Sequence, residues 1–319
     1  MNGAYAGTRV LVLGASGFIG GWVVRALARL GASPLAVVRD VSHTARVTDL
    51  GAATVIVADL MQPDSVAAIV RDASPAITFN LAGYGVDRSE HDSAHMQAMN
   101  ATLPACLCQA VADLGAASPW NSLRLVHVGS ALEYGQVHGQ ITEDVTPQPD
   151  TDYGRTKLMG TEAVLRAART TGLRAAVVRL FTVYGPGEHA TRLLPTLMDA
   201  ARLRTTVSLT SGDQPRDFTY VEDAVDGLLR TGRTPESSGQ LLNVATGHLT
   251  TVRKFAETAA KVLGIPEDRL RFGAASKDAG EMYHGEVSTA LMDRVLGWRP
   301  GVSVTDGIRR AWDQERKKR

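Results

Sequence analysis

Tyr153 and Lys157 lie four residues apart in the segment 152–157, DYGRTK. On a helix, residues at this spacing project from the same face, so a phenol and an ammonium would be neighbours. A nearby positive charge lowers the pKa of a phenol and makes it a usable acid or base near neutral pH. The pair therefore predicts redox chemistry on a carbinol or a ketone. Such pairs also arise by chance on helix surfaces, so this prediction depends on the rest of the chain.

A glycine-rich segment near the N-terminus is the second feature that suggests chemistry. It follows the apolar run 8–13, TRVLVL, and precedes the segment 18–30, whose apolar residues recur at helical spacing. Glycines between a strand and a helix let a pyrophosphate approach the helix amides closely, although the spacing here is G-x-x-G-x-x-G. The segment predicts a dinucleotide site formed by Gly14, Ser16, Gly17, Phe18, Ile19 and Gly20.

The end of the second predicted strand bears on the choice between NAD and NADP. Arg39 stands there, about twenty residues beyond the glycines, and an arginine at this place accepts the 2′-phosphate of NADP. We therefore predict NADP, with NAD possible. Asp40 is adjacent and would suit the ribose of NAD, and a solvated strand end would also explain Arg39.

Strand and helix patterns alternate through the first 180 residues. After the first run, short apolar runs follow at 35–38, 53–57, 76–81, 123–128 and 175–180, each separated by enough chain for a helix. Strands covered by helices on both faces have this pattern. The predicted fold class is α/β, with a Rossmann-type doubly wound parallel sheet and a smaller C-terminal α/β substrate domain that begins after the turn-rich segment 184–187.

Composition excludes several classes of protein. With 34 basic and 33 acidic residues and no basic stripe, nucleic acid is not an expected partner. No stretch reaches the length of a membrane span, so we expect no membrane partner, a soluble protein and a cytoplasmic location. Cys106 and Cys108 would point to different faces of a helix. We therefore predict neither a disulfide nor a metal site.

Further motifs give the chain a resemblance to the extended short-chain dehydrogenase/reductase family, which includes nucleotide-sugar epimerases, dehydratases and ketoreductases. The resemblance covers nearly the whole chain. It rests on the glycine segment and on 58–60 ADL, 80–83 NLAG, 128–135 VGSALEYG, 153–157 YGRTK, 179–187 RLFTVYGPG, 216–224 RDFTYVEDA and 296–300 LGWRP.

The resemblance implies roles for individual residues. Ser130 matches the Ser/Thr that hydrogen-bonds the reacting oxygen, Tyr153 is the proton carrier, and Lys157 also binds the nicotinamide ribose. Other cofactor-binding residues would be Asp59, Leu60, Leu81, Ala82, Gly83 and Asn100, the last supporting the catalytic loop. Asp59 would alternatively cap a helix, and Asn100 would alternatively satisfy backbone groups.

The segment after Ser130 bears on the reaction. The 4,6-dehydratases of this family carry an acidic pair, or one Glu, just after the Ser/Thr, whereas this chain has Ala131 and Leu132 there and Glu133 one position later. The segment looks more like that of 4-keto-6-deoxy nucleotide-sugar reductases, and we predict an NAD(P)-dependent 4-keto-sugar reductase. A 4-epimerase is the alternative. A non-catalytic cofactor-sensing protein is a remote one, because such proteins typically lose the Tyr or the Lys.

The substrate side is less defined. Arg216 would clamp a nucleotide diphosphate, because guanidinium grips phosphate oxygens bidentately, and Arg192 would assist, although both would also suit surface ion pairs. The late arginine usual in the family is missing near 277–281, KDAGE. Without it, the usual binding mode of a UDP- or TDP-sugar is not assured. A nucleotide sugar is the expected substrate, and a nucleoside or another modified substrate stays open.

We predict two regions and a homodimer. The nucleotide-binding domain would comprise 1–181 with about 216–247, and the substrate-binding region about 182–215 with 248–319. The segments 105–111 and 159–168 carry apolar residues at helical spacing, and in this family such helices often form a four-helix dimer contact. Alternatively, the apolar faces of these two helices would pack only against the sheet and form no dimer contact.

Overall fold

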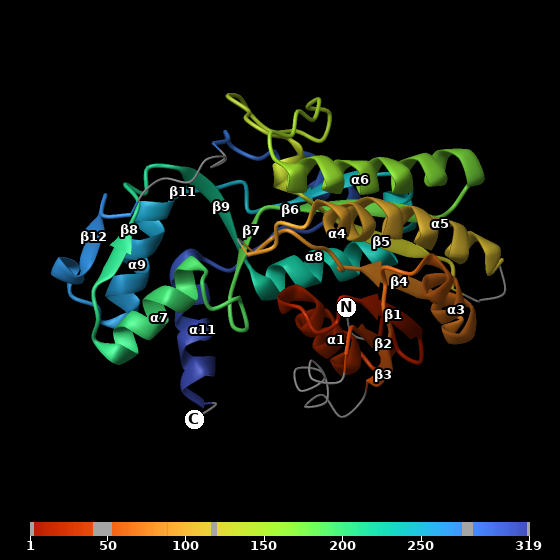
Figure 1. Cartoon of the computed structure of the whole chain (residues 1–319), viewed down its shortest axis with the longest axis horizontal. Coiled ribbons are helices and arrows are strands. Elements are labelled where there is room, and N and C mark those ends of the chain that lie inside the picture. The colour runs from red at the N-terminus through yellow and green to blue at the C-terminus, as the bar shows by residue number, and fades with distance from the viewer. Residues whose placement is uncertain (1–2, 41–52, 88, 116–119, 276–282, 318–319) are drawn as a thin grey trace.

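The computed structural model describes residues 3–40, 53–87, 89–115, 120–275 and 283–317. A parallel sheet of seven strands forms the larger part of the molecule (Figure 1). Its strands, in spatial order, are β10 (Leu241–Val244), β6 (Ala175–Leu180), β5 (Leu125–Ser130), β4 (Ile77–Asn80), β1 (Arg9–Leu13), β2 (Ser33–Val38) and β3 (Thr54–Val57). Six of these strands lie on the six predicted apolar runs, so the predicted sheet is confirmed, and β10 adds an edge strand that the pattern did not indicate.

Helices cover both faces of this sheet because neighbouring strand residues point to opposite sides. On one side, Val10 and Val12 pack with α1 (Phe18–Arg29) and α8 (Val221–Arg233). On the other side, Leu11 and Leu13 belong to a core with the helices α3 (Pro63–Ala73), α5 (Leu103–Asp113) and α6 (Asp152–Thr171). The order of strands reverses at β1, which β4 and β2 flank, and in open sheets this is where ligands bind.

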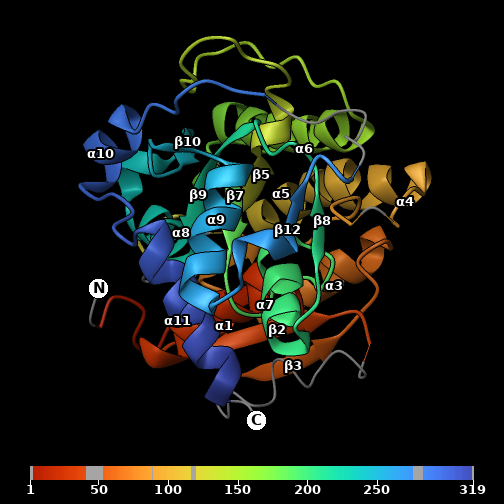
Figure 2. The same cartoon turned by 90° about the vertical axis from the view of Figure 1, so that its left-hand side faces the viewer.

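The smaller part of the molecule contains two short sheets and three helices. One sheet is β11 (Leu249–Thr251), β9 (Pro215–Tyr220) and β7 (Thr182–Tyr184), and the other is β12 (Leu270–Phe272) with β8 (Val207–Leu209). Figure 2 shows α9 (Val252–Leu263) packed beside both α7 (Leu193–Leu203) and α11 (Val304–Lys317). The remaining elements are α4 (Ser93–Gln97), α10 (Ala290–Leu296), the π-helix η2 (Ala98–Thr102) and the 3₁₀ turns η3 (Ala131–Glu133), η4 (Pro235–Ser237) and η5 (Glu267–Arg269).

The chain crosses between the two parts more than once. Of the segment 216–247, α8 packs on the large sheet and β10 joins it, whereas β9 pairs with β7 and β11 of the small sheet. Within the described ranges, no helix has the length and apolar character to cross a membrane. Those ranges also contain no cluster of three or more His, Cys, Asp or Glu side chains suited to a metal ion.

Candidate active site

The glycine turn forms the first wall of the site. Gly14 has φ +75°, and a Cβ there would lie 2.7 Å from the backbone nitrogen of Ala82. A Cβ at Gly20 would collide with the carbonyl oxygen of Gly14. Glycine is thus required at both positions for the turn to close against the next strand end. Gly17 is exposed and precedes α1 without a side-chain cap, so the first amides of this helix have no partner within the helix.

The segment that follows β4 lies against this turn. The amide of Leu81 donates to Leu13 O at 3.1 Å, and the amide of Ala82 donates to the side chain of Asn80 at 3.2 Å. The structure therefore brings Gly14 and the predicted residues Leu81, Ala82 and Gly83 together at the point where the strand order reverses. Ser16, Phe18 and Ile19 are half-buried on the same turn.

Three further predicted cofactor residues follow the ends of β2 and β3. Arg39 is exposed one residue after β2 and forms no hydrogen bond or ion pair within the described ranges. Asp59 accepts a hydrogen bond from the amide of Met61 at 3.0 Å and thereby shapes the turn before α3. Leu60 packs half-buried against the core on this side of the sheet. All three occupy the same edge of the sheet as the glycine turn.

Ser130, Tyr153 and Lys157 converge beside this turn. Ser130 ends β5, while Tyr153 and Lys157 lie on the first turns of α6, as predicted. The Ser130 hydroxyl is one of the groups that favour the charged form of the Tyr153 phenol, so the two side chains lie near each other. Lys157 is buried, and its ammonium donates to Val128 O at 2.6 Å. Thr151 caps the helix by accepting from the amide of Gly154 at 3.0 Å, which fixes where the Tyr–Lys pair begins.

The predicted lowering of the Tyr153 pKa is not found. Desolvation by the surrounding protein raises the pKa of this phenol, and the Ser130 hydroxyl only partly opposes that effect. Burial also lowers the pKa of Lys157 to about 8, although the negative charge of Glu133 acts in the other direction. Burial, which the spacing of the pair does not reveal, outweighs the charge effect. Tyr153 is consequently a protonated group at neutral pH, which suits it to donate a proton.

Glu133 is occupied by structural contacts. Its side chain is inaccessible to solvent and pairs with the Nε of Arg179, from β6, at 2.8 Å. Its other oxygen accepts a hydrogen bond from the amide of Ser130 at 2.7 Å. The guanidinium of Arg179 lies 4.2 Å from the ring centre of Tyr134. Glu133 therefore fixes the backbone of Ser130, a role that the sequence analysis did not assign to it.

Asn100 connects the loop after β4 to α6. It is fully buried, and its amide nitrogen donates to Tyr84 O at 2.7 Å and to Thr156 Oγ1 at 3.1 Å. Its amide oxygen accepts from the amide of Tyr84 at 3.0 Å. Both of its amide hydrogens are therefore used within the protein. Its assignment to the cofactor site stays a prediction.

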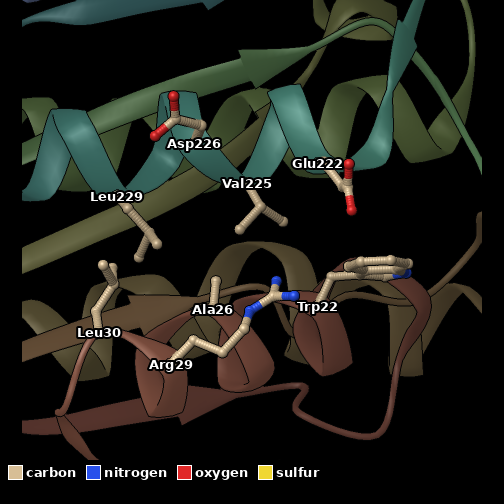
Figure 3. Close-up of a pocket in the computed structure, with 8 residues that line it drawn as sticks. All are labelled: Trp22, Ala26, Arg29, Leu30, Glu222, Val225, Asp226 and Leu229. Carbon is tan, nitrogen blue, oxygen red and sulfur yellow. The ribbon is translucent and has the colours of Figure 1, made fainter. Parts of the chain in front are cut away.

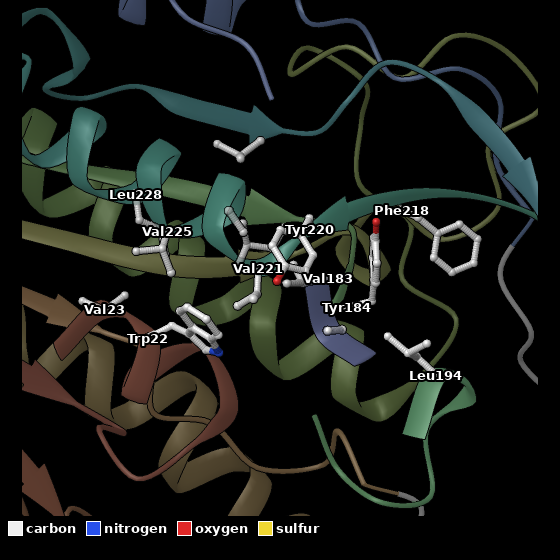
Figure 4. Close-up of a cluster of buried hydrophobic side chains, with 14 of the residues drawn as sticks. Trp22, Val23, Val183, Tyr184, Leu194, Phe218, Tyr220, Val221, Val225 and Leu228 are labelled. Carbon is white, nitrogen blue, oxygen red and sulfur yellow. The ribbon is translucent and has the colours of Figure 1, made fainter. Parts of the chain in front are cut away.

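A cavity of about 460 Å³ lies on the side of the small sheet. Tyr184, Phe218 and Phe255 form part of its apolar wall, and the ring centroids of the stacked Phe218 and Phe255 lie 4.2 Å apart. Figure 4 shows Tyr184 and Phe218 within the cluster of buried apolar side chains. The polar residues that line it include both predicted arginines, Arg192 and Arg216, with Asp87, Thr182 and Glu188. The structure thus brings the two predicted substrate arginines into one cavity, whereas Ser130, the third predicted substrate residue, is not part of its lining.

The two arginines also have contacts within the protein. Arg192 is paired with Glu188 at 3.5 Å, and Arg216 donates to Pro215 O at 2.8 Å. The segment 277–281, where the family's late arginine is missing, lies outside the described residues. A smaller cavity of about 220 Å³ between α1 and α8 contains none of the predicted site residues (Figure 3).

Comparison with known proteins agrees with this geometry. Residues 10–245 match the model of the NAD dependent epimerase/dehydratase family. The chain belongs to this family. The predicted resemblance is thereby confirmed, and the family match covers both the glycine turn and the Ser130–Tyr153–Lys157 group.

Relatives of the chain extend over nearly its whole length. It is 29% identical to a dTDP-6-deoxy-L-talose 4-dehydrogenase (NAD(P)(+)) of Kitasatospora kifunensis, over 96% of this chain and 95% of that protein. It is 28% identical to a UDP-glucose 4-epimerase of Mycolicibacterium smegmatis, over 94% of this chain and 96% of that protein. The solved structure of MoeE5 in complex with UDP-glucose and NAD is 27% identical in sequence, with a TM-score of 0.83. The match covers 97% of this chain and 99% of that chain.

Two carboxylates of the site were missed or undervalued by sequence analysis. Glu133 was noted only as a nearby carboxylate, and Glu188 was not considered. The spacing of Glu133 from Ser130 matches a capping box, S-x-x-E, which is a signal that a closer reading of the sequence would have found. Glu188 lies in the turn-rich stretch before α7, where no periodicity indicates which side chains are buried.

Proposed function

We propose that the protein is a reductase that transfers hydride from NADPH to a 4-keto nucleotide sugar. The observation that carries this proposal is the buried Glu133–Arg179 pair. Removal of water from a sugar needs an additional acid and base close to the Ser/Tyr pair, and the only carboxylate in the segment 130–135 is held in a structural ion pair. Ser130, Tyr153 and Lys157 alone suffice for reduction of a ketone.

The glycine turn has the space that a dinucleotide phosphate needs. A Cβ at Gly17 would stand on the exposed face of the turn, where within the chain it would meet only Gly14 O at 3.2 Å. Its absence leaves room for a pyrophosphate at the start of α1, so the residues fit a dinucleotide. Gly14 to Gly20 would hold the pyrophosphate, Arg39 the 2′-phosphate, and Leu81 to Gly83 the path toward the catalytic group.

In the proposed mechanism the bound dinucleotide supplies hydride to the carbonyl carbon. Ser130 donates a hydrogen bond to the carbonyl oxygen and orients it toward Tyr153. The protonated Tyr153 phenol then gives its proton to that oxygen as negative charge develops there. Lys157, buried one helical turn beyond Tyr153 on α6, would hold the nicotinamide ribose. Asn100 keeps the loop after β4 and α6 in register during this step.

A 4-epimerase is the second candidate, and one observation favours it. The similarity to the UDP-glucose 4-epimerase of Mycolicibacterium smegmatis extends over nearly the whole chain. The two candidates differ in how the cofactor is used, because a reductase exchanges it in each cycle whereas an epimerase regenerates it. The decisive experiment supplies NADPH with a 4-keto-6-deoxy nucleotide sugar and, separately, UDP-glucose without added cofactor. Consumption of NADPH supports the reductase, and formation of UDP-galactose without net redox change contradicts it.

Replacing Arg39 with alanine is expected to weaken NADPH binding about tenfold or more and to leave NADH binding unchanged. The reason is that only NADPH carries a 2′-phosphate with which a guanidinium can form charge-assisted hydrogen bonds. Titration of both cofactors into both proteins measures the effect. Arg71→Ala, an exposed arginine on α3, is the matched control. Equal losses for the two cofactors would mean that Arg39 acts on the fold rather than on the phosphate.

We also propose a homodimer formed through α5 and α6. These helices pack against each other on one face of the sheet, and Met159 of α6 is 47% exposed. Met159→Glu should dissociate the dimer, since in a two-fold contact the new charge appears on both sides. Leu203→Glu on α7, where the side chain is 71% exposed, is the control. Sedimentation velocity tests this, and a wild type that is monomeric at micromolar concentration contradicts the proposal.

A further inference from the structure

Glu188 is a buried carboxylate in the wall of the 460 Å³ cavity. It lies in the loop between β7 and α7, and its side chain is only 7% exposed. Carboxylates in such surroundings are normally paired and hydrogen-bonded, because burial of an uncompensated charge is costly. The function proposed above assigns no role to this residue.

The carboxylate of Glu188 is incompletely satisfied. Oε1 faces the Nε of Arg192 at 3.5 Å, the limit of a hydrogen bond, and Oε2 is buried without a hydrogen-bond partner among the described residues. Burial raises the pKa of Glu188 to about 7, although Arg192 and the amide of Gly185 favour the charged form. A buried acceptor without a donor is rare in native proteins. A bound molecule with a hydrogen-bond donor would supply what Oε2 lacks.

Neighbouring contacts indicate which end of the site this is. His189, next to Glu188, pairs with Asp87 at 3.1 Å, and Asp87 lines the same cavity. Gly85, in the same loop as Asp87, lies against Tyr153, because a Cβ there would be 3.1 Å from the ring, so the Glu188–Arg192 pair lies toward the reacting end of the substrate. Arg216, in contrast, comes from the start of β9, where its strand partner is Thr250 of β11. The pair is therefore placed to contact the sugar rather than the nucleotide.

We propose that Glu188 accepts a hydrogen bond from a hydroxyl or amino group of the sugar and thereby selects substrates that carry a donor at that position. Arg192 holds the carboxylate through its Nε and balances its charge, so a neutral donor is sufficient. A substrate without this donor leaves Oε2 buried and unpaired. Because an unpaired buried acceptor is costly, a site of this kind discriminates strongly between ligands that differ only in the donor. This inference rests on the proposed action on nucleotide sugars.

The test compares free nucleotide with nucleotide sugar. Calorimetric titrations of UDP, UDP-glucose and UDP-glucosamine into wild type, Glu188→Leu and Glu188→Gln give the gain in affinity that the sugar contributes to each protein. The sugar-dependent gain should fall about tenfold or more in Glu188→Leu, because a hydrogen bond to a charged acceptor is lost. It should fall less in Glu188→Gln, which keeps one acceptor oxygen. The affinity for UDP should stay within about twofold of wild type, because the pair is placed away from the nucleotide end.

The controls separate the possible failures. Glu222→Gln removes an exposed carboxylate outside this cavity and should change no affinity. Thermal unfolding shows that the variants fold. A larger loss for UDP-glucosamine identifies an amine as the preferred donor, and equal losses identify a hydroxyl. Unchanged sugar-dependent affinity in Glu188→Leu, or an equal loss for UDP, overturns this inference alone. A wild type that binds neither UDP nor dTDP, with or without a sugar, overturns the proposed function.

Discussion

Tyr153→Phe should lower kcat by about 10² to 10⁴ while leaving the affinity for the dinucleotide nearly unchanged. The substitution removes only the hydroxyl, and burial keeps that hydroxyl protonated at neutral pH, so the lost group is the proposed proton donor. The ring continues to fill its place beside Gly85 and Met96. Stopped-flow or steady-state measurement of NADPH consumption gives kcat, and fluorescence titration gives the affinity.

The conditions and the control for this experiment follow from the structure. The assay is run at pH 7, below the pKa of about 8 of Lys157, so that the amine stays charged in both proteins. Tyr220→Phe removes a hydroxyl from the buried aromatic cluster, where the ring packs against Tyr184 at 5.6 Å. We expect that variant to keep most of the wild-type kcat. A Tyr153→Phe protein with more than about a hundredth of the wild-type rate would show that another group donates the proton.

Glu133→Gln should destabilise the fold by about 3 to 5 kcal/mol, because it leaves the charge of Arg179 buried without its partner. The same substitution weakens the contact that holds the amide of Ser130, so kcat should fall in the part of the protein that remains folded. Urea unfolding measures the first effect, and NADPH consumption with a keto-sugar measures the second.

The double variant Glu133→Gln/Arg179→Met is the informative comparison. Removing both charges replaces a buried ion pair with uncharged groups. Such a replacement often changes the free energy of unfolding very little. Stability should therefore recover substantially, whereas kcat should remain low because the carboxylate that fixes Ser130 is still absent. If the loss of unfolding free energy in the double variant equals the sum of the losses in the two single variants, Glu133 and Arg179 do not stabilise each other.

Local patterns were sufficient to predict the large sheet. A buried parallel strand must be apolar on both faces, so each of the runs 8–13 and 175–180 gives a strong local signal. β10 was not predicted as a strand, because it lies beyond the segment in which strand and helix patterns alternate and joins the sheet only by pairing with β6. The small sheet was also not predicted in detail, because β9 pairs with β7 and β11, which are separated from it in the sequence.

The positions of the proposed catalytic group, Ser130 at a strand end and Tyr153 with Lys157 on one helix, were predicted because the proposed chemistry requires fixed residue types at fixed spacings. The pKa shifts of Tyr153 and Lys157 were not predicted, because the burial that causes them depends on the packing of α6 against the sheet. The role of Glu133 likewise depends on Arg179, 46 residues further along the chain, and the contacts of Asn100 depend on the loop after β4. Such long-range contacts leave no periodic signal in the sequence.

The loop that carries Glu188 and Arg192 is also attached to the helix of the glycine turn. The Nε1 of Trp22, on α1, donates to Pro186 O at 2.9 Å, and a Cβ at Gly187 would lie 4.0 Å from the ring of Phe18. One short stretch of chain thus contacts the helix of the glycine turn and also lines the cavity. Thermodynamic linkage makes any coupling between the turn and the cavity reciprocal. By whatever factor the dinucleotide changes the affinity for the sugar ligand, that ligand changes the affinity for the dinucleotide by the same factor.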